Sequence, residues 1–205
     1  MKEIILGALG EGIFALARLL TIRLASWLMR LLPKGRLESG LICFKHRSLN
    51  REWFESTFQN GGDVLMLTTM SEHTLTEIEG YFRDGKVNVQ RLRVLTLSPD
   101  LPGDIVDSIA SHLGESSQKV KEQISRACSR WRALENNHTV LEVRPYSTSP
   151  TLHAIFRGNE SADIELLTFQ TVPSDRASLF LDAKQNPVAL DLFKTATEKL
   201  WNASR

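Results

Sequence analysis

The sequence predicts an α/β domain whose mixed, partly parallel sheet is covered by helices on both faces, preceded by a long N-terminal amphipathic helix. Short apolar runs bounded by turn residues alternate with helical patterns between residues 41 and 135. This alternation favours parallel strand pairs. Strand-like runs separated only by short turns follow between residues 139 and 181, and these favour antiparallel pairs.

The expected elements follow from these patterns. We expect strands at residues 41–44, 63–69, 91–97, 139–144, 152–156, 164–169 and 178–181. We expect helices at residues 49–58, 71–85, 103–135 (two helices divided near Gly114) and 187–202. Leu113 and Leu192 are expected on the buried faces of their helices.

The N-terminal segment carries a helical apolar stripe over residues 4–32. Leu20 and Leu24 lie on this stripe, whereas Glu11 and Arg23 lie on the opposite, polar side. Charged residues interrupt every window long enough to span a bilayer, so a transmembrane helix is not expected. The stripe can lie in a membrane surface, seal a homo-oligomer or pack on its own domain, and these three interpretations stay open.

A helix-breaking Pro33-Lys34-Gly35 run ends this segment, so we expect a helix in residues 1–35 and a domain in residues 36–205. The chain has no small-residue cleavage site after the apolar run, so a signal peptide is not expected. The predicted location is the cytoplasm, with peripheral attachment to the inner face of the membrane as the alternative.

Bulk composition excludes several classes of function. Of 205 residues, 42% are hydrophobic and 24% charged, which is typical of a globular protein. The net charge of +1 gives no general attraction to nucleic acid. The basic run Arg126–Arg132 contains Trp131, and with acidic residues nearby we interpret it as a solvated helix face. Cysteines and histidines show no metal-ligand spacing, so neither a metal nor a cofactor is expected.

Four phrases in order resemble one half of the phospholipase D-like superfamily over about residues 38–204. They are Asp63–Thr69 followed by His73, Leu92–Asp100, Val140–Tyr146 with Pro150 shortly after, and Leu192–Ala203. The resemblance is to single-copy domains attached to bacterial regulatory or signalling modules. It implies the fold class above, and it implies dimers in which two halves meet around one phosphodiester.

The family motif H-x-K-x-x-x-x-D is degenerate in this chain. The resemblance aligns His153 with the nucleophilic histidine and Glu160 with the acid that orients it. Ile155 stands where the family has its phosphate-binding lysine. Phosphoryl transfer depends on stabilising charge, so this loss favours a protein that is not an enzyme. Arg157 lies on the same strand face as His153 and is the candidate substitute cation.

The resemblance also suggests a ligand site. Arg144, Tyr146, His153 and Arg157 come from two strands that we expect to be neighbours, and they are the candidate ligand-binding residues. Such a cationic cleft suits a phosphate-bearing or nucleotide ligand.

Three functions therefore remain open. The first is a catalytically degenerate binding, sensing or scaffold domain, oligomerised or membrane-associated through its N-terminal helix. The second is a phosphodiesterase or nuclease active as a dimer, with His153 as nucleophile. The third is a membrane-perturbing effector in which the helix acts and the domain controls it.

Overall fold

The computed structural model describes residues 43–46, 51–70, 72–166 and 177–204. All of them belong to one compact unit that runs from Ser39 to Arg205. The expected N-terminal helix at residues 4–32 and the expected domain boundary at residue 35 lie outside the described residues. Within the part of the chain that the structure describes, no helix combines the length and the apolar character that crossing a bilayer requires.

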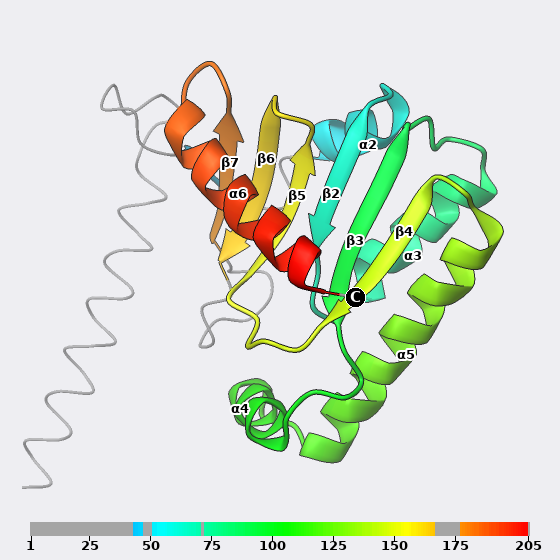
Figure 1. Cartoon of the computed structure of the whole chain (residues 1–205), viewed down its shortest axis with the longest axis vertical. Helices are drawn as coiled ribbons and strands as arrows, with labels where there is room; N and C mark the ends of the chain where they lie inside the picture. The colour runs from blue at the N-terminus through cyan, green and yellow to red at the C-terminus, as the bar shows by residue number, and fades with distance from the viewer. Residues whose placement is uncertain (1–42, 47–50, 71, 167–176, 205) are drawn as a thin grey trace, which may run out of the picture. The chain divides into compact units, whose positions relative to one another are not determined.

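The strands form a single seven-stranded sheet in the order β1-β7-β6-β5-β2-β3-β4 (Figure 1). They are β1 Cys43–His46, β2 Asp63–Leu67, β3 Arg91–Leu97, β4 Leu141–Tyr146, β5 Leu152–Arg157, β6 Ser161–Leu166 and β7 Ala177–Asp182. The helices are α2 Arg51–Gln59, α3 Glu72–Arg83, α4 Gly103–Leu113, α5 Ser117–Asn137 and α6 Pro187–Ala203. The predicted α/β order is confirmed, with element ends shifted by at most three residues.

The sheet has a parallel half and an antiparallel half. β2, β3 and β4 pair in parallel, because helical crossovers return the chain to the same end of the sheet each time. β5 then pairs antiparallel with β2, and β6, β7 and β1 continue the sheet in antiparallel fashion. The expected mixed, partly parallel sheet is thus confirmed.

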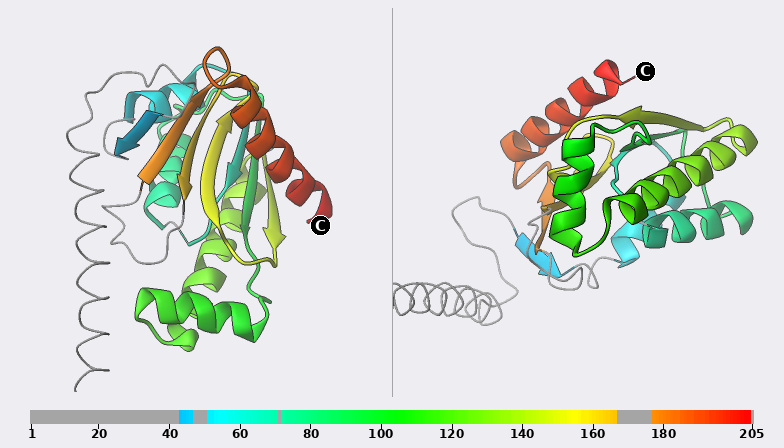
Figure 2. Two further views of the ribbon diagram at one scale, coloured as in Figure 1. Left: turned by 90° about the vertical axis from the view of Figure 1, so that its left-hand side faces the viewer. Right: turned by 90° about the horizontal axis from the view of Figure 1, so that it is seen from below.

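Helices cover both faces, as Figure 2 shows from the side and from below. One face, which we call the α6 face, carries α6, and α4 packs in the same apolar cluster beyond the carboxyl ends of β2 and β3 (Figure 1). The other, which we call the α2–α3 face, packs against α2, α3 and Trp131 of α5. Successive strand residues alternate between these faces. On β5, Phe156 therefore belongs to the α6 face and Ile155 to the α2–α3 face.

The division of residues 103–135 into two helices is confirmed. Gly114 ends α4 in the left-handed region at φ 65°, which glycine adopts without a Cβ clash. The Ser116 hydroxyl then accepts a hydrogen bond from the Lys119 N–H at 3.3 Å and caps α5.

Two of the expected buried side chains are exposed. Leu113 is 42% exposed because the buried stripe of α4 runs through Val106 and Ile109 instead. Leu192 is 66% exposed because α6 buries the stripe that contains Leu190 and Trp201.

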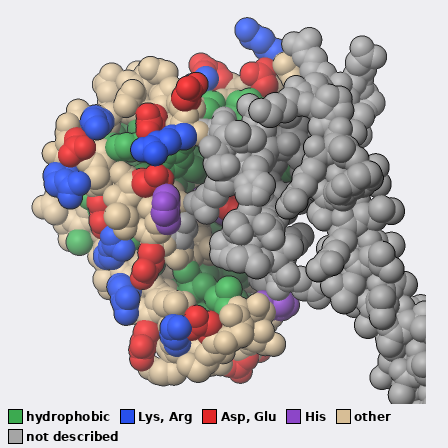
Figure 3. Space-filling model, turned by 180° about the vertical axis from the view of Figure 1, so that it is seen from behind, with side chains coloured by type: hydrophobic (Ala, Val, Ile, Leu, Met, Phe, Trp, Pro, Cys, Tyr) green, Lys and Arg blue, Asp and Glu red, His purple; other side chains and the backbone are tan. Residues whose placement is uncertain are grey.

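Ion pairs neutralise the basic run of α5. Each arginine of this run has a carboxylate partner: Arg126 with Glu72 at 3.6 Å, Arg130 with Glu79 at 2.6 Å and Arg132 with Glu135 at 2.7 Å. Trp131 between them is only 1% exposed and belongs to the core. Figure 3 shows basic and acidic side chains interspersed on this side of the molecule. The run therefore lacks the excess positive charge and exposed aromatic ring that would favour nucleic acid.

The outer edge of β4 is closed by its own chain. The Glu135 side chain accepts a hydrogen bond from the Val143 N–H at 2.7 Å, and the Leu141 N–H donates to the His138 carbonyl at 3.0 Å. Pro145 has no N–H to offer. A closed edge of this kind prevents the addition of another strand.

Candidate functional site

A tight turn fixes which side chains of β5 and β6 face one another. The Glu160 N–H donates to the Arg157 carbonyl at 3.0 Å, and Gly158 supplies the positive φ of 52° that the turn needs. The resulting register places His153 directly opposite Glu165. His153 is 7% exposed and Glu165 is 5% exposed, so an imidazole and a carboxylate are buried side by side on the α2–α3 face.

The position expected for a lysine is occupied by a core side chain. Ile155 is 5% exposed and stands opposite Met66 of β2 in the apolar cluster of the α2–α3 face. On its other side it faces Asp163 of β6. The immediate neighbours of His153 on β5 and β6 thus include an aliphatic side chain and two carboxylates, and no lysine or arginine.

Arg157 and Glu160 lie at the far end of β5. Arg157 lies four positions further along the strand than His153, which corresponds to about 13 Å. Arg157 pairs with Glu160 at 3.2 Å and donates to the Ser56 hydroxyl of α2 at 3.5 Å. The expected pairing of Glu160 with His153 is therefore wrong, and the carboxylate beside His153 is Glu165.

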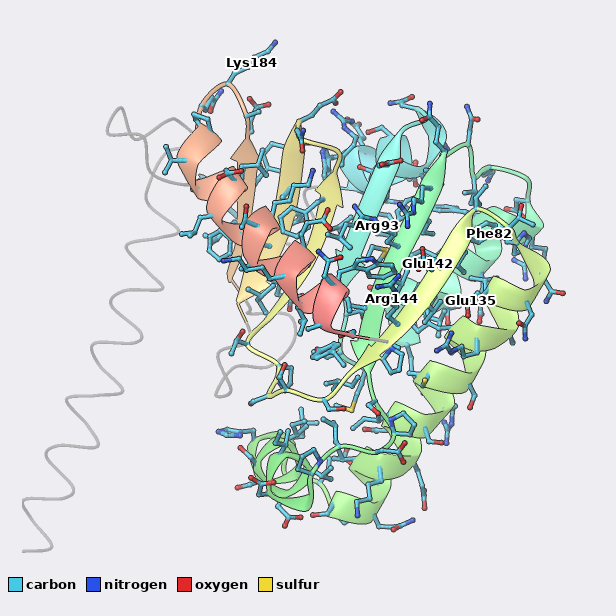
Figure 4. The ribbon with its side chains drawn as sticks, in the orientation of Figure 1. Phe82, Arg93, Glu135, Glu142, Arg144 and Lys184 are labelled. Carbon is cyan, nitrogen blue, oxygen red and sulfur yellow. The ribbon has the colours of Figure 1, made fainter. Side chains whose placement is uncertain are left out.

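Arg144 and Tyr146 lie on the opposite side of the sheet from His153 and Arg157. β4 is an edge strand, and β3 and β2 separate it from β5, so the two strands are not neighbours as the sequence had suggested. Figure 4 shows Arg144 on the α6 face, beside the carboxyl end of α6. The structure therefore does not gather the four predicted ligand-binding residues into one cleft.

These two residues hold α6 and the strand ends in place. Arg144 donates to the Trp201 carbonyl at 3.0 Å, and its guanidinium stacks 4.3 Å from the centre of the Trp201 ring. Tyr146 is 3% exposed and donates to the Thr68 carbonyl at 3.4 Å. Burial raises the pKa of the Tyr146 hydroxyl, so it stays protonated at physiological pH.

Sequence reasoning missed the residue that attaches α2 to the antiparallel half of the sheet. The Trp53 indole N–H donates to the Ser161 hydroxyl at 3.0 Å. Its ring meets Phe180 edge-on, with centroids 5.6 Å apart. A tryptophan on a short helix indicates an anchor of this kind, but its partners on β6 and β7 follow only from the strand order.

A separate small pocket opens on the α6 face. Its volume is about 130 Å³. The lining residues are Asp63, Leu65, Arg93, Phe156, Gly158, Asn159 and Lys194. They come from β2, β3, β5, the turn after β5, and α6, and none of them had been predicted as a site residue.

Arg93 ties this pocket to α6. Both terminal nitrogens of its guanidinium donate to Glu198, each at 2.7 Å. The hydrogen bond from Arg93 lowers the pKa of the Glu198 carboxyl. On the other rim, the Lys194 ammonium donates to the Asn159 side-chain carbonyl. Among the described residues, no three His, Cys, Asp or Glu side chains are placed to hold a metal ion.

The fold defines the chain as an α/β domain with a seven-stranded mixed sheet. No protein-family model matches the chain, and no curated protein matches it. Among the solved structures that are similar to it are two of low sequence identity. One is TrmBL2, described as an archaeal chromatin protein with a novel mode of DNA binding. It has 11% identity and a TM-score of 0.47, and the match covers 95% of this chain and 65% of TrmBL2.

The other is Nuc, a phospholipase D family member from Salmonella typhimurium. It has 12% identity and a TM-score of 0.40, and the match covers 76% of this chain and 88% of Nuc. At these identities and scores the two likenesses assign neither a family nor a function to the chain.

Proposed function

We propose that this chain is a catalytically degenerate phospholipase D-like domain that works by binding or assembly and does not cleave phosphodiesters. The observation that carries this proposal is the burial of Ile155 at the lysine position, in an apolar cluster with Met66. A phosphodiester in the transition state carries negative charge that a cation must stabilise. An isoleucine cannot supply that charge.

The surroundings of His153 also oppose phosphate binding on this face. The register places Glu165 opposite His153 and Asp163 opposite Ile155, so the β6 side of the site presents two carboxylates. The nearest arginine along β5, Arg157, is already paired with Glu160. Neither of these positions supplies the cation that a bound phosphate needs.

The second candidate is a phosphodiesterase that is active as a dimer, and one observation favours it. Glu165 lies where a carboxylate can orient the His153 imidazole, as acids do for catalytic histidines elsewhere. In that case the missing cation would come from a second copy of the chain.

Hydrolysis of bis(p-nitrophenyl) phosphate and of single-stranded DNA by the full chain distinguishes the two candidates. We expect the rate to equal that of a sample without protein, and to be the same for His153→Ala. His112→Ala is the matched control, because His112 is an exposed histidine of α4. Cleavage that is lost in His153→Ala and kept in His112→Ala would overturn the proposal in favour of the dimeric enzyme.

The assembly role of residues 4–32 needs its own experiment. In the full chain, Leu24→Glu places a charge on the predicted apolar stripe, whereas Arg23→Glu changes the polar side. If the stripe drives assembly, light scattering will show a lower mass for Leu24→Glu alone. If the stripe binds a lipid surface, the parent and Arg23→Glu will float with neutral phosphatidylcholine vesicles and Leu24→Glu will not. No effect of Leu24→Glu in either assay would exclude both roles.

A further inference from the structure

The pocket on the α6 face is rich in hydrogen-bond donors. Lys194 of α6 donates to the Asn159 side-chain carbonyl in the turn after β5. An ammonium has three N–H groups and this bond uses one of them. Because its oxygen is engaged, the Asn159 amide offers its NH₂ group on the same rim. Two side chains from different elements thus hold donors together at the mouth of the pocket.

Lys194 supplies the cation of the pocket that can face a ligand. Arg93 and Asp63 are the other charged residues of the lining. Arg93 is bound by both oxygens of Glu198, so it adds little attraction for an anion. Lys194 has no carboxylate within ion-pair distance among the residues that the structure describes, and its longer-range attraction to Glu198 leaves two of its N–H groups to donate to a ligand.

The size and floor of the pocket limit the ligand to a small group. Leu65 and Phe156 line it, and they are 1% and 0% exposed. Apolar walls reduce the local dielectric constant and so strengthen a hydrogen bond to an anion. A cavity of about 150 Å³ holds a benzene molecule, so a pocket of about 130 Å³ has room for about five heavy atoms. That matches a phosphate group, whereas a whole nucleotide needs about 300 Å³ or more.

We infer that this pocket binds the phosphate group of a small phosphomonoester, with Lys194 and Asn159 as its main ligands. The site lies on the opposite face of the sheet from His153, because the Phe156 side of β5 faces away from the His153 side. The inference rests on the binding role proposed above, and it moves the phosphate ligand from the vestigial motif to the α6 face.

Calorimetric titration of the full chain with inorganic phosphate, at constant ionic strength, tests the inference. Loss of a charge-assisted hydrogen bond typically weakens binding by about tenfold, which is the expected effect of Lys194→Met. Lys199→Met is the matched control, since Lys199 is an exposed lysine of α6 that does not line the pocket. We expect its affinity to stay within about twofold of the parent, because the charge that it removes is distant and screened.

A second variant tests the same contact without shortening any side chain that lines the pocket. Asn159→Asp is nearly isosteric and exposed, and it places a carboxylate against Lys194, so phosphate binding should disappear. Absence of saturable binding by the parent, or equal weakening by Lys194→Met and Lys199→Met, would overturn the inference. Loss of binding in His153→Ala alone would place the phosphate at the vestigial motif and leave the proposed binding role standing. Phosphodiester cleavage that depends on His153 would refute the proposed non-catalytic role, but it would not contradict phosphate binding in the pocket.

Discussion

The Arg93–Glu198 pair gives the clearest quantitative prediction, because it joins the middle of the sheet to α6 with two short hydrogen bonds. Replacing Glu198 by Gln keeps the shape of the side chain and removes its charge. The Arg93 side chain is only 12% exposed, so it would keep an uncompensated positive charge. Glu198 itself is 30% exposed, so water reduces the cost relative to a fully buried pair.

The expected loss of unfolding free energy is about 2 kcal/mol, between the values for exposed and buried pairs. For a protein of this size that corresponds to a fall in Tm of about 4–8 °C. Urea unfolding followed by tryptophan fluorescence measures it, since Trp201 lies beside Arg93. The control is Glu55→Gln, which breaks an exposed helical pair with Arg51 and should change stability far less.

The same pair predicts a dependence on pH. Its bond to Arg93 holds the folded-state pKa of Glu198 below the ordinary 4.5. The stabilisation is therefore fully present above pH 4.5 and is lost as the pH falls through the folded-state pKa. The stability difference between the parent and Glu198→Gln should shrink in that window. Equal stability of Glu198→Gln and Glu55→Gln at pH 7 would refute the assigned role of the pair.

Three further variants test single features by urea unfolding. Gly114→Ala should lower the free energy of unfolding by about 1 kcal/mol, because alanine disfavours the left-handed region. The added Cβ would meet no atom within 4 Å, so the loss would come from the backbone alone. An unchanged urea midpoint would contradict this. Trp53→Phe keeps an aromatic ring but loses the indole N–H that bonds Ser161 and part of the indole packing, so we expect a loss of at least about 1 kcal/mol, and a neutral result would show these contacts to be unimportant. Glu135→Ala leaves the Val143 N–H without its acceptor and should cost about 1–2 kcal/mol, whereas Glu122→Ala, elsewhere on α5, should cost little.

The order of elements could be predicted from the sequence because each element has its own signal. Apolar runs bounded by Gly, Pro and Asn indicated the strands, and the helical stripes indicated the helices. The β3 bounds, Arg91–Leu97, were predicted to the residue. Burial was less predictable at helix surfaces. Leu192 lies on an apolar pattern, but the position of α6 on the sheet decides which stripe is covered.

The site was harder to predict because it depends on strand order. Arg144 and His153 lie on consecutive strands, and we took them to be neighbours, but β5 crosses to pair with β2. The position of Glu165 opposite His153 could have been predicted from the sequence. A tight turn at Gly158 would have set the hairpin register and placed Glu165 opposite His153. The pocket around Lys194 could not be predicted, since its residues meet only when α6 is laid across the sheet.

The closed edge of β4 has a consequence for how copies of this chain can associate. A sheet with two open edges can extend without limit, as fibrils do, because each added copy leaves a new edge exposed. Here Glu135 and Pro145 block the β4 end, so no strand of a second copy can extend the sheet there. Extension in both directions, which a fibril needs, is therefore excluded. Sheet pairing between copies could use at most the other end, and it would then join no more than two copies.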